Sequence, residues 1–289
     1  MADRIGQQDV QGENISEAVK GFGLKKFKLR QVLLIQSSNK LTETYYRETA
    51  AELTPAGETW SIQGVARGAA FPHVDPTWTK VQGRHIKFAA EAFVFLEDKL
   101  LDAFNVQRRS IIRVARSIMN QTDSYIYTTL SGASGISTAA TAAPWDSATV
   151  ADRDPMGDIL GGISTMDESN YDALENGFLL VSPKDYKNLM RNSKVINNPS
   201  FKTADVVSNG RVGQIAGLTI IKTTSVTADQ FMIVIGQVAA TWKTAVSQQS
   251  NVDTQTHWGV RDIIASYEIG HVQTTDLLAI FVGTNTQAS

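Results

Sequence analysis

No cysteine occurs among the 289 residues of this chain. Its absence excludes disulfide bonds, thiolate metal sites and cysteine nucleophiles, and it is typical of a protein that folds in a reducing cytosol. Histidine is also scarce, with four residues. No run of 18 apolar residues occurs, and the polar N-terminus lacks an apolar core of signal-peptide length. We therefore predict neither a membrane span nor an export signal of that type.

Neither sign of charge dominates the chain. Lysine and arginine number 27 against 29 aspartates and glutamates, which gives a formal net charge of −2. A whole-molecule field that attracts nucleic acid or membranes is therefore absent, and any such contact must be local. Because 42% of the residues are hydrophobic, the chain is expected to be globular and to bury a sizeable core.

The longest regular pattern lies between residues 91 and 130. From Val106 on, apolar residues recur at spacings of three, four and seven, which predicts an amphipathic helix about 37 Å long, separated from the preceding segment by a break at Asn105. The predicted buried face carries Ile111, Ile112, Ala115, Ile118, Met119, Tyr125 and Ile126. The predicted exposed face carries Arg109, Arg113, Arg116, Asn120 and Asp123. Such a helix needs a broad surface to lie on.

Residues 41 to 92 alternate between apolar and polar side chains on both sides of a turn at Pro55-Ala56-Gly57, a pattern that predicts a long β-hairpin. A hairpin alone is only marginally stable in water, so this one is expected to lie on another surface, such as a neighbouring subunit. The candidate intersubunit residues are Tyr45, Tyr46, Trp60, Arg67 and Trp78.

The second half of the chain mixes helices and strands. Residues 131 to 155 are small and polar and predict a linker or mobile loop. Helices are expected from Asp158 to Leu174 and from Pro183, with a long polar loop at 195 to 214. Strands are expected at 178–182, 217–226, 230–236, 260–273 and 277–283. Because strands and helices do not alternate regularly, the expected class is α+β.

No catalytic or phosphate-binding motif is complete. The segment Gly21-Phe22-Gly23 lacks the third glycine of a dinucleotide fingerprint, and no P-loop occurs. His73 and Asp75 are the best candidates for a metal or hydrolytic site, but no second histidine stands at ligand spacing. We expect no catalytic residue, no metal and no cofactor, and keep a hydrolase with an unrecognised site as an alternative.

The order of these segments carries more information than any single residue. A polar arm and a two-armed hairpin are followed by the strand KFAAEAFVFLEDKLLDAF and by a long helix that ends in SIMNQTDSYIYTTLSG. Downstream come FLLVSPKDYKNLM, RVGQIAGLTIIKTTSV, QFMIVIG and DLLAIFVG. This order resembles that of the HK97-like major capsid proteins of tailed bacteriophages, in which the long helix also ends with an aspartate, here Asp123, before small residues.

The resemblance implies a division of the chain into named parts. These are an N-terminal arm at 1–40, an E-loop hairpin at 41–92, a peripheral (P) domain with a spine helix at 93–134, an axial (A) domain at 135–258 and return strands to the P domain at 259–289. It also implies that the protein is made in the host cytoplasm. There it would assemble with itself into hexamers and pentamers of an icosahedral virion shell around double-stranded DNA.

Further partners also follow from the resemblance. Residues Lys25, Lys26, Arg109, Arg113 and Arg116 are expected to face the genome and to contact it without sequence specificity. A separate scaffolding protein, a portal protein and decoration proteins are expected as well. The tip of the hairpin, Leu53 to Gly68, holds no lysine, so an isopeptide cross-link between subunits is not expected. An encapsulin-type nanocompartment, which shares the fold and packages an enzyme, and a tail or accessory protein are alternatives.

Overall fold

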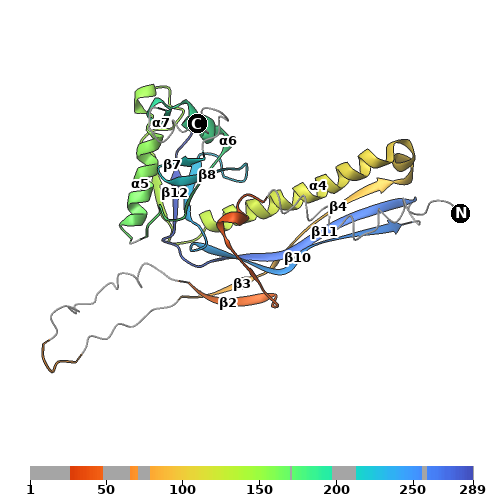
Figure 1. The fold of residues 1–289 in the computed structure, drawn as a ribbon, viewed down its shortest axis with the longest axis horizontal. Coiled ribbons are helices and arrows are strands. Elements are labelled where there is room, and N and C mark those ends of the chain that lie inside the picture. Colours follow the sequence, from red (N-terminus) through yellow and green to blue (C-terminus); the bar gives the residue numbers. More distant parts are fainter. Residues whose placement is uncertain are drawn as a thin grey trace.

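The computed structural model describes residues 27–47, 66–70, 79–169, 171–196, 213–255 and 259–288. Within this part of the chain, a long sheet and a long helix extend from a second unit built on a six-stranded sheet (Figure 1). A two-stranded hairpin lies beneath the long sheet, near the end that adjoins the second unit. None of the helices described is long and apolar enough to cross a membrane.

The long sheet has four strands in the order β1-β10-β11-β4. Strand β1 runs parallel to β10, and the other two pairings are antiparallel. The bounds are β1 Leu34–Ser37, β10 Ala240–Gln255, β11 Arg261–Thr274 and β4 Ile86–Phe95. The register between β10 and β11 shifts around Val246. The expected strand at 260–273 is confirmed as β11, whereas β10 was not predicted.

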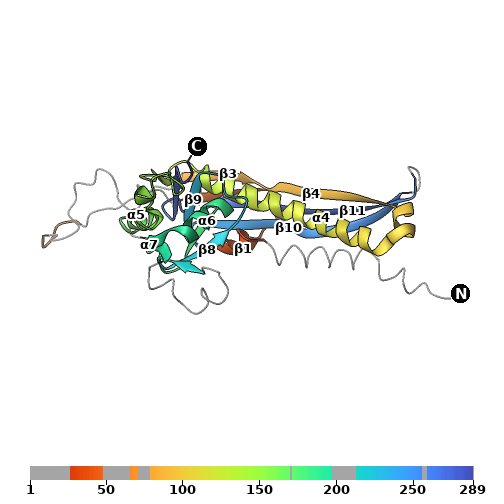
Figure 2. The same ribbon diagram turned by 90° about the horizontal axis from the view of Figure 1, so that it is seen from above.

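Helix α4, Leu96–Ser131, lies along one face of the long sheet (Figure 2). The predicted stripe is confirmed at Ile111, Ala115, Ile118, Met119 and Ile126, which are all buried. Tyr125 and Ile112 are only partly buried, and Ile112 belongs to the outward side of the helix. The predicted break is wrong, since the backbone is helical from residue 96 through residue 105. Asparagine has only modest helix propensity but does not break a helix, and α4 therefore reaches about 54 Å at about 1.5 Å per residue.

Asp123 corrects the predicted exposed face of α4. Its carboxylate is 5% exposed and accepts hydrogen bonds from the backbone N–H groups of Lys28 and Leu29, each at 3.3 Å. Burial raises the pKa of this carboxyl, while the two N–H groups oppose the rise. Because a buried carboxylate needs partners, Asp123 fixes where the segment from residue 27 onward enters the core.

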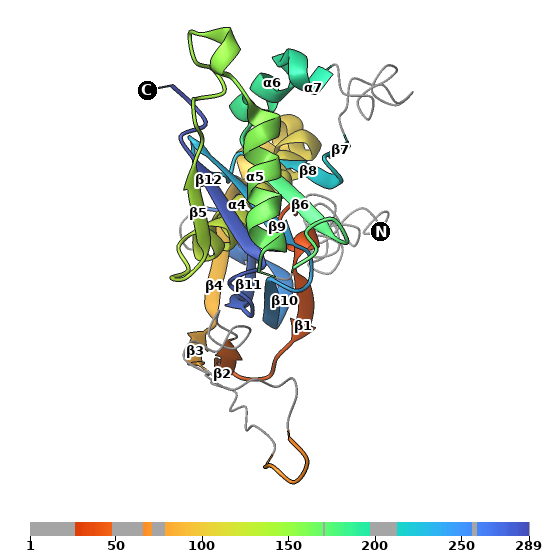
Figure 3. The same cartoon turned by 90° about the vertical axis from the view of Figure 1, so that its left-hand side faces the viewer.

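The six-stranded sheet has the order β5-β12-β9-β6-β8-β7. Its strands are β5 Ser137–Ala140, β12 Ile280–Thr284, β9 Gln230–Ile235, β6 Gly177–Val181, β8 Leu218–Lys222 and β7 Gln214–Ile215. Helix α5, Pro155–Asp167, packs on it (Figure 3). The contact is close at Gly162, where a Cβ atom would lie 2.8 Å from Ile233 and Phe281. Helices α6, Pro183–Arg191, and α7, Ser193–Ile196, lie at one edge.

Several predictions for the second half of the chain are corrected. Residues 131–155 are more than a linker, because β5 pairs with β12 and Trp145 is buried with its indole N–H donating to Asp158 at 2.8 Å. Helix α5 begins three residues before Asp158 and ends at Asp167, short of Leu174. Most of the predicted polar loop at 195–214 lies outside the described residues.

Three strands pair in a different sheet from the one that the predicted division of the chain implies. Strand β10 falls within the range given to the A domain, yet it pairs with β11 under α4. Strand β12 falls within the return strands, yet it lies in the six-stranded sheet. Strand β4 starts at Ile86, inside the predicted hairpin, and belongs to the long sheet. The chain therefore passes back and forth between the two sheets, and a division into consecutive residue ranges does not describe this path.

Candidate assembly surfaces

The hairpin consists of β2, Thr42–Arg47, paired antiparallel with β3, Thr79–Arg84. Side chains alternate along β2, so Tyr45 is half-buried and Tyr46 is 58% exposed on the opposite side. The two tyrosines therefore cannot both meet the same neighbouring surface. Arg67 is exposed in its short described segment, whereas Trp60 and Trp78 lie outside the described residues.

The base of the hairpin is tied to the end of β11. The Arg47 guanidinium donates to the Thr274 carbonyl at 3.2 Å and to the Thr274 hydroxyl. Glu43 accepts from the Gln273 side-chain amide at 2.8 Å and from the Ser38 hydroxyl. These bonds hold β2 and β3 against the long sheet and thereby set the direction in which the hairpin leaves it.

Two histidines lie inside this base. His271 is hydrogen-bonded through Nδ1 to the Tyr125 hydroxyl at 2.9 Å, and the ring centroids of His271 and His85 are 6.0 Å apart. Gly83 makes room for the His271 ring, since a Cβ there would lie 2.1 Å from Nε2. Burial lowers the pKa of His271, the nearby His85 lowers it further, and the Glu43 carboxylate acts in the opposite direction.

The folded protein is therefore expected to lose stability in mild acid through His271. Because its folded pKa is below the ordinary 6.5, the unfolded chain binds the proton first as the pH falls. The loss begins as the pH falls through about 6.5 and levels off below the folded pKa. Urea unfolding midpoints between pH 8 and pH 5 should fall less for His271→Gln than for the wild type. Parallel curves for the two proteins would contradict this assignment.

An arginine row marks the outward face of α4. Arg109, Arg113 and Arg116 are exposed at spacings of four and three and line a groove of about 650 Å³ together with Val106, Ser110 and Ile112. Among the side chains that the structure describes, none of the three arginines forms an ion pair. The structure thus brings these three predicted residues together, whereas Lys25 and Lys26 lie outside the described residues.

An apolar surface at the free end of the long sheet was not predicted. Phe93 and Phe95 at the end of β4, Leu96 and Leu100 at the start of α4, and Val260 before β11 are all exposed, with Leu100 at 78%. The amide of Leu96 donates to the Val260 carbonyl at 2.9 Å, which places these segments side by side. The run of apolar residues in FVFLEDKLL was a signal for this surface, but it is equally typical of a buried strand and helix.

Comparison with known proteins identifies the family to which the chain belongs. A model of the family described as phage capsid protein matches residues 80–275. No curated protein sequence matches the chain. The candidate hydrolytic residues His73 and Asp75 lie outside the described residues.

Solved structures share the fold over almost the whole chain. The capsid of the cyanophage P-SCSP1u has a TM-score of 0.68 and 10% identity, covering 91% of this chain and 89% of that one. The capsid of the native GTA particle has a TM-score of 0.65 and 12% identity, covering 91% and 90%. The virus-like particle from Pyrococcus furiosus has a TM-score of 0.64 and 10% identity, covering 93% and 97%. Since the family model matches more than half of the chain, this protein belongs to the phage capsid protein family, with the HK97-like fold, and is a structural shell protein rather than an enzyme.

Proposed function

We propose that this chain is the major capsid protein of a tailed phage or a related particle, and that it assembles into hexamers and pentamers of an icosahedral shell around double-stranded DNA. Membership of the phage capsid family carries the proposal. The exposed apolar end of the long sheet and the anchored hairpin support it, because such surfaces mark contacts with other proteins. Closed symmetry repeats each weak contact many times over a shell.

Electron microscopy of particles that contain this chain, isolated from their natural source, tests the proposal. Closed shells that contain nuclease-protected DNA are the expected result. Shells that contain a protein cargo and no DNA would instead identify the alternative, an encapsulin-type nanocompartment. A chain that stays monomeric at high concentration would refute a shell function altogether.

The arginine row is the described surface best suited to the genome. Three exposed guanidinium groups on one helix face, without carboxylate partners among the described side chains, are available for phosphate oxygens. Each phosphate contact contributes about 0.9 to the slope of log affinity against log salt. This contribution depends on phosphate and not on base sequence, as packaging of a whole genome requires.

Replacing Arg109, Arg113 and Arg116 together by serine is therefore expected to leave the subunit folded and to weaken binding of duplex DNA. The salt slope should fall by about 2 to 3, measured by DNA titration at several salt concentrations. Replacing three exposed cations elsewhere, Lys80 and Arg84 on β3 together with Lys187 on α6, gives the same change in net charge. Equal losses in the two triple variants would show that net charge matters and that the row does not.

A further inference from the structure

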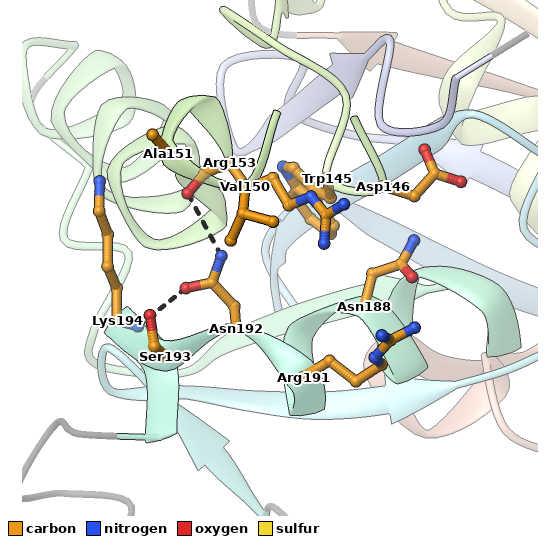
Figure 4. Close-up of a pocket in the computed structure, with 10 residues that line it drawn as sticks. All are labelled: Trp145, Asp146, Val150, Ala151, Arg153, Asn188, Arg191, Asn192, Ser193 and Lys194. Carbon is orange, nitrogen blue, oxygen red and sulfur yellow. Dashed lines mark hydrogen bonds between the residues drawn. The ribbon is translucent and has the colours of Figure 1, made fainter. Parts of the chain in front are cut away.

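A cavity of about 330 Å³ opens at the end of α5 where the helix begins (Figure 4). It lies between the short helix η2, Val150–Asp152, and the helices α6 and α7. Trp145 forms part of its wall, and Val150, 68% exposed, stands at its rim. The charged residues that line it are Asp146, Arg153, Arg191 and Lys194. Basic side chains therefore outnumber acidic ones in the lining.

The ion pairs around the cavity leave the charges of Arg153 and Arg191 without a carboxylate partner among the described residues. Lys194 is bound to Asp154 at 2.7 Å, and Asp146 is bound to Lys184 at 2.9 Å. Arg153 donates through Nε to the Ser147 carbonyl at 2.6 Å, an acceptor without charge. These bonds neutralise both carboxylates and leave the positive charge of the arginines unbalanced.

Two donors at the cavity have no partner in the described part of the chain. The Arg191 guanidinium, at the end of α6, forms no ion pair there. The side-chain nitrogen Nδ2 of Asn188 is buried and unpaired, and Figure 4 shows its amide directed into the cavity. Because the Arg191 side chain is exposed at the cavity, its guanidinium can donate to an incoming carboxylate.

The other end of α5 carries the complementary charge. Asp167, Glu168, Asp172 and Glu175 are exposed, and none forms an ion pair among the described residues. Leu174, 52% exposed, lies within this acidic edge. Because α5 has 13 residues, the two ends lie about 20 Å apart, too far for one copy to satisfy itself. A single subunit therefore presents a basic cavity and an acidic edge on different sides.

We propose that the cavity of one copy receives the acidic edge of a second copy, with Arg191 donating to Asp167 or Glu168 and with Leu174 against Val150. This inference rests on the proposed shell function and specifies one of its contacts. Two different surfaces that meet head to tail form a heterologous interface, which closes into a ring when the rotation permits. The opposite charges would also set the orientation of neighbouring copies.

Charge reversal tests the contact. Arg191→Glu, and separately Asp167→Lys with Glu168→Lys, should each weaken association of subunits about tenfold or more, measured by analytical ultracentrifugation. Combining all three substitutions should restore association, because the charges are complementary again. Lys187→Glu is the matched control, since Lys187 is exposed on the same helix but does not line the cavity, and it should associate as the wild type does.

The outcomes separate this inference from the proposed function. A wild-type chain that does not associate would refute the shell function itself. A wild type that assembles while Arg191→Glu assembles equally well would refute the contact alone. Loss of association without rescue in the combined variant would also refute it. Titration with inorganic phosphate then identifies a free-anion site, if the wild type binds phosphate and Arg191→Glu does not.

Discussion

Replacing Arg30 by alanine is expected to destabilise the subunit by about 3–5 kcal/mol, because Glu268 then remains buried without a counter-charge. The Arg30 guanidinium lies 2.9 Å from the Glu268 carboxylate, and the two side chains are 11% and 1% exposed. The guanidinium also stacks 3.8 Å from the ring centroid of Phe27 and 4.7 Å from that of Trp242. Urea unfolding of the soluble subunit measures the loss.

Two further variants distinguish a lost charge partner from lost packing. Arg30→Met combined with Glu268→Leu should recover most of the stability, since no buried charge is left unpaired. Lys194→Ala removes an ion pair whose side chains are 51% and 44% exposed, and it should cost less than about 1 kcal/mol. If Arg30→Ala unfolds at the wild-type urea concentration, the pair does not hold the arm segment to the core.

This ion pair also shows where sequence reasoning stops. Arg30 and Glu268 are separated by 238 positions, and each is typical of a solvated surface when read in sequence. Asp123 was assigned to the exposed face of α4 for the same reason, although it binds the backbone of Lys28 and Leu29. Buried charges are recognised only when their partners are known, and these partners come from distant segments.

The strands differ in how far they could be predicted. The stripe of α4 and the apolar strands β6, β9 and β12 were predictable because their side chains repeat with the period of their structure. Strand β10 was not, since most of ATWKTAVSQQSNVDTQ is polar and its register shifts around Val246. Its extended form depends on pairing with both β1 and β11. Tertiary contacts override a weak local pattern in such cases.

The candidate surfaces also differ in how far they could be predicted from the sequence. The arginine row was predictable, because its spacing of four and three places the three side chains on one helix face. The cavity beside η2 was not, because Trp145, Arg153 and Arg191 come from three segments that only the fold brings together. The apolar end of the long sheet could not be predicted for a different reason. Exposed and buried apolar runs look alike in sequence, and only the structure shows that this one has no cover within the described chain.

A proline at Ala115 is expected to prevent folding of the subunit or to cost about 3 kcal/mol or more. Ala115 is fully buried, in a small core with Val94 of β4, Ile111 of α4 and Ile264 of β11. Proline removes the amide hydrogen that bonds to the carbonyl of Ile111, and its ring clashes with that carbonyl. The resulting kink would lift the first half of α4 from the sheet and expose the small core to water.

A second proline substitution in the same helix separates the effect of the position from the effect of proline itself. Glu97→Pro places the same residue in the first turn of α4, where amide groups have no intrahelical acceptor, and it should change stability by much less. Circular dichroism and urea unfolding compare the two variants. Soluble Ala115→Pro protein with wild-type helix content would show that α4 does not need to be continuous. Since α4 spans the long sheet and reaches the core of the six-stranded sheet through Ile126 and Leu130, loss of that continuity should uncouple the two parts of the subunit and abolish assembly.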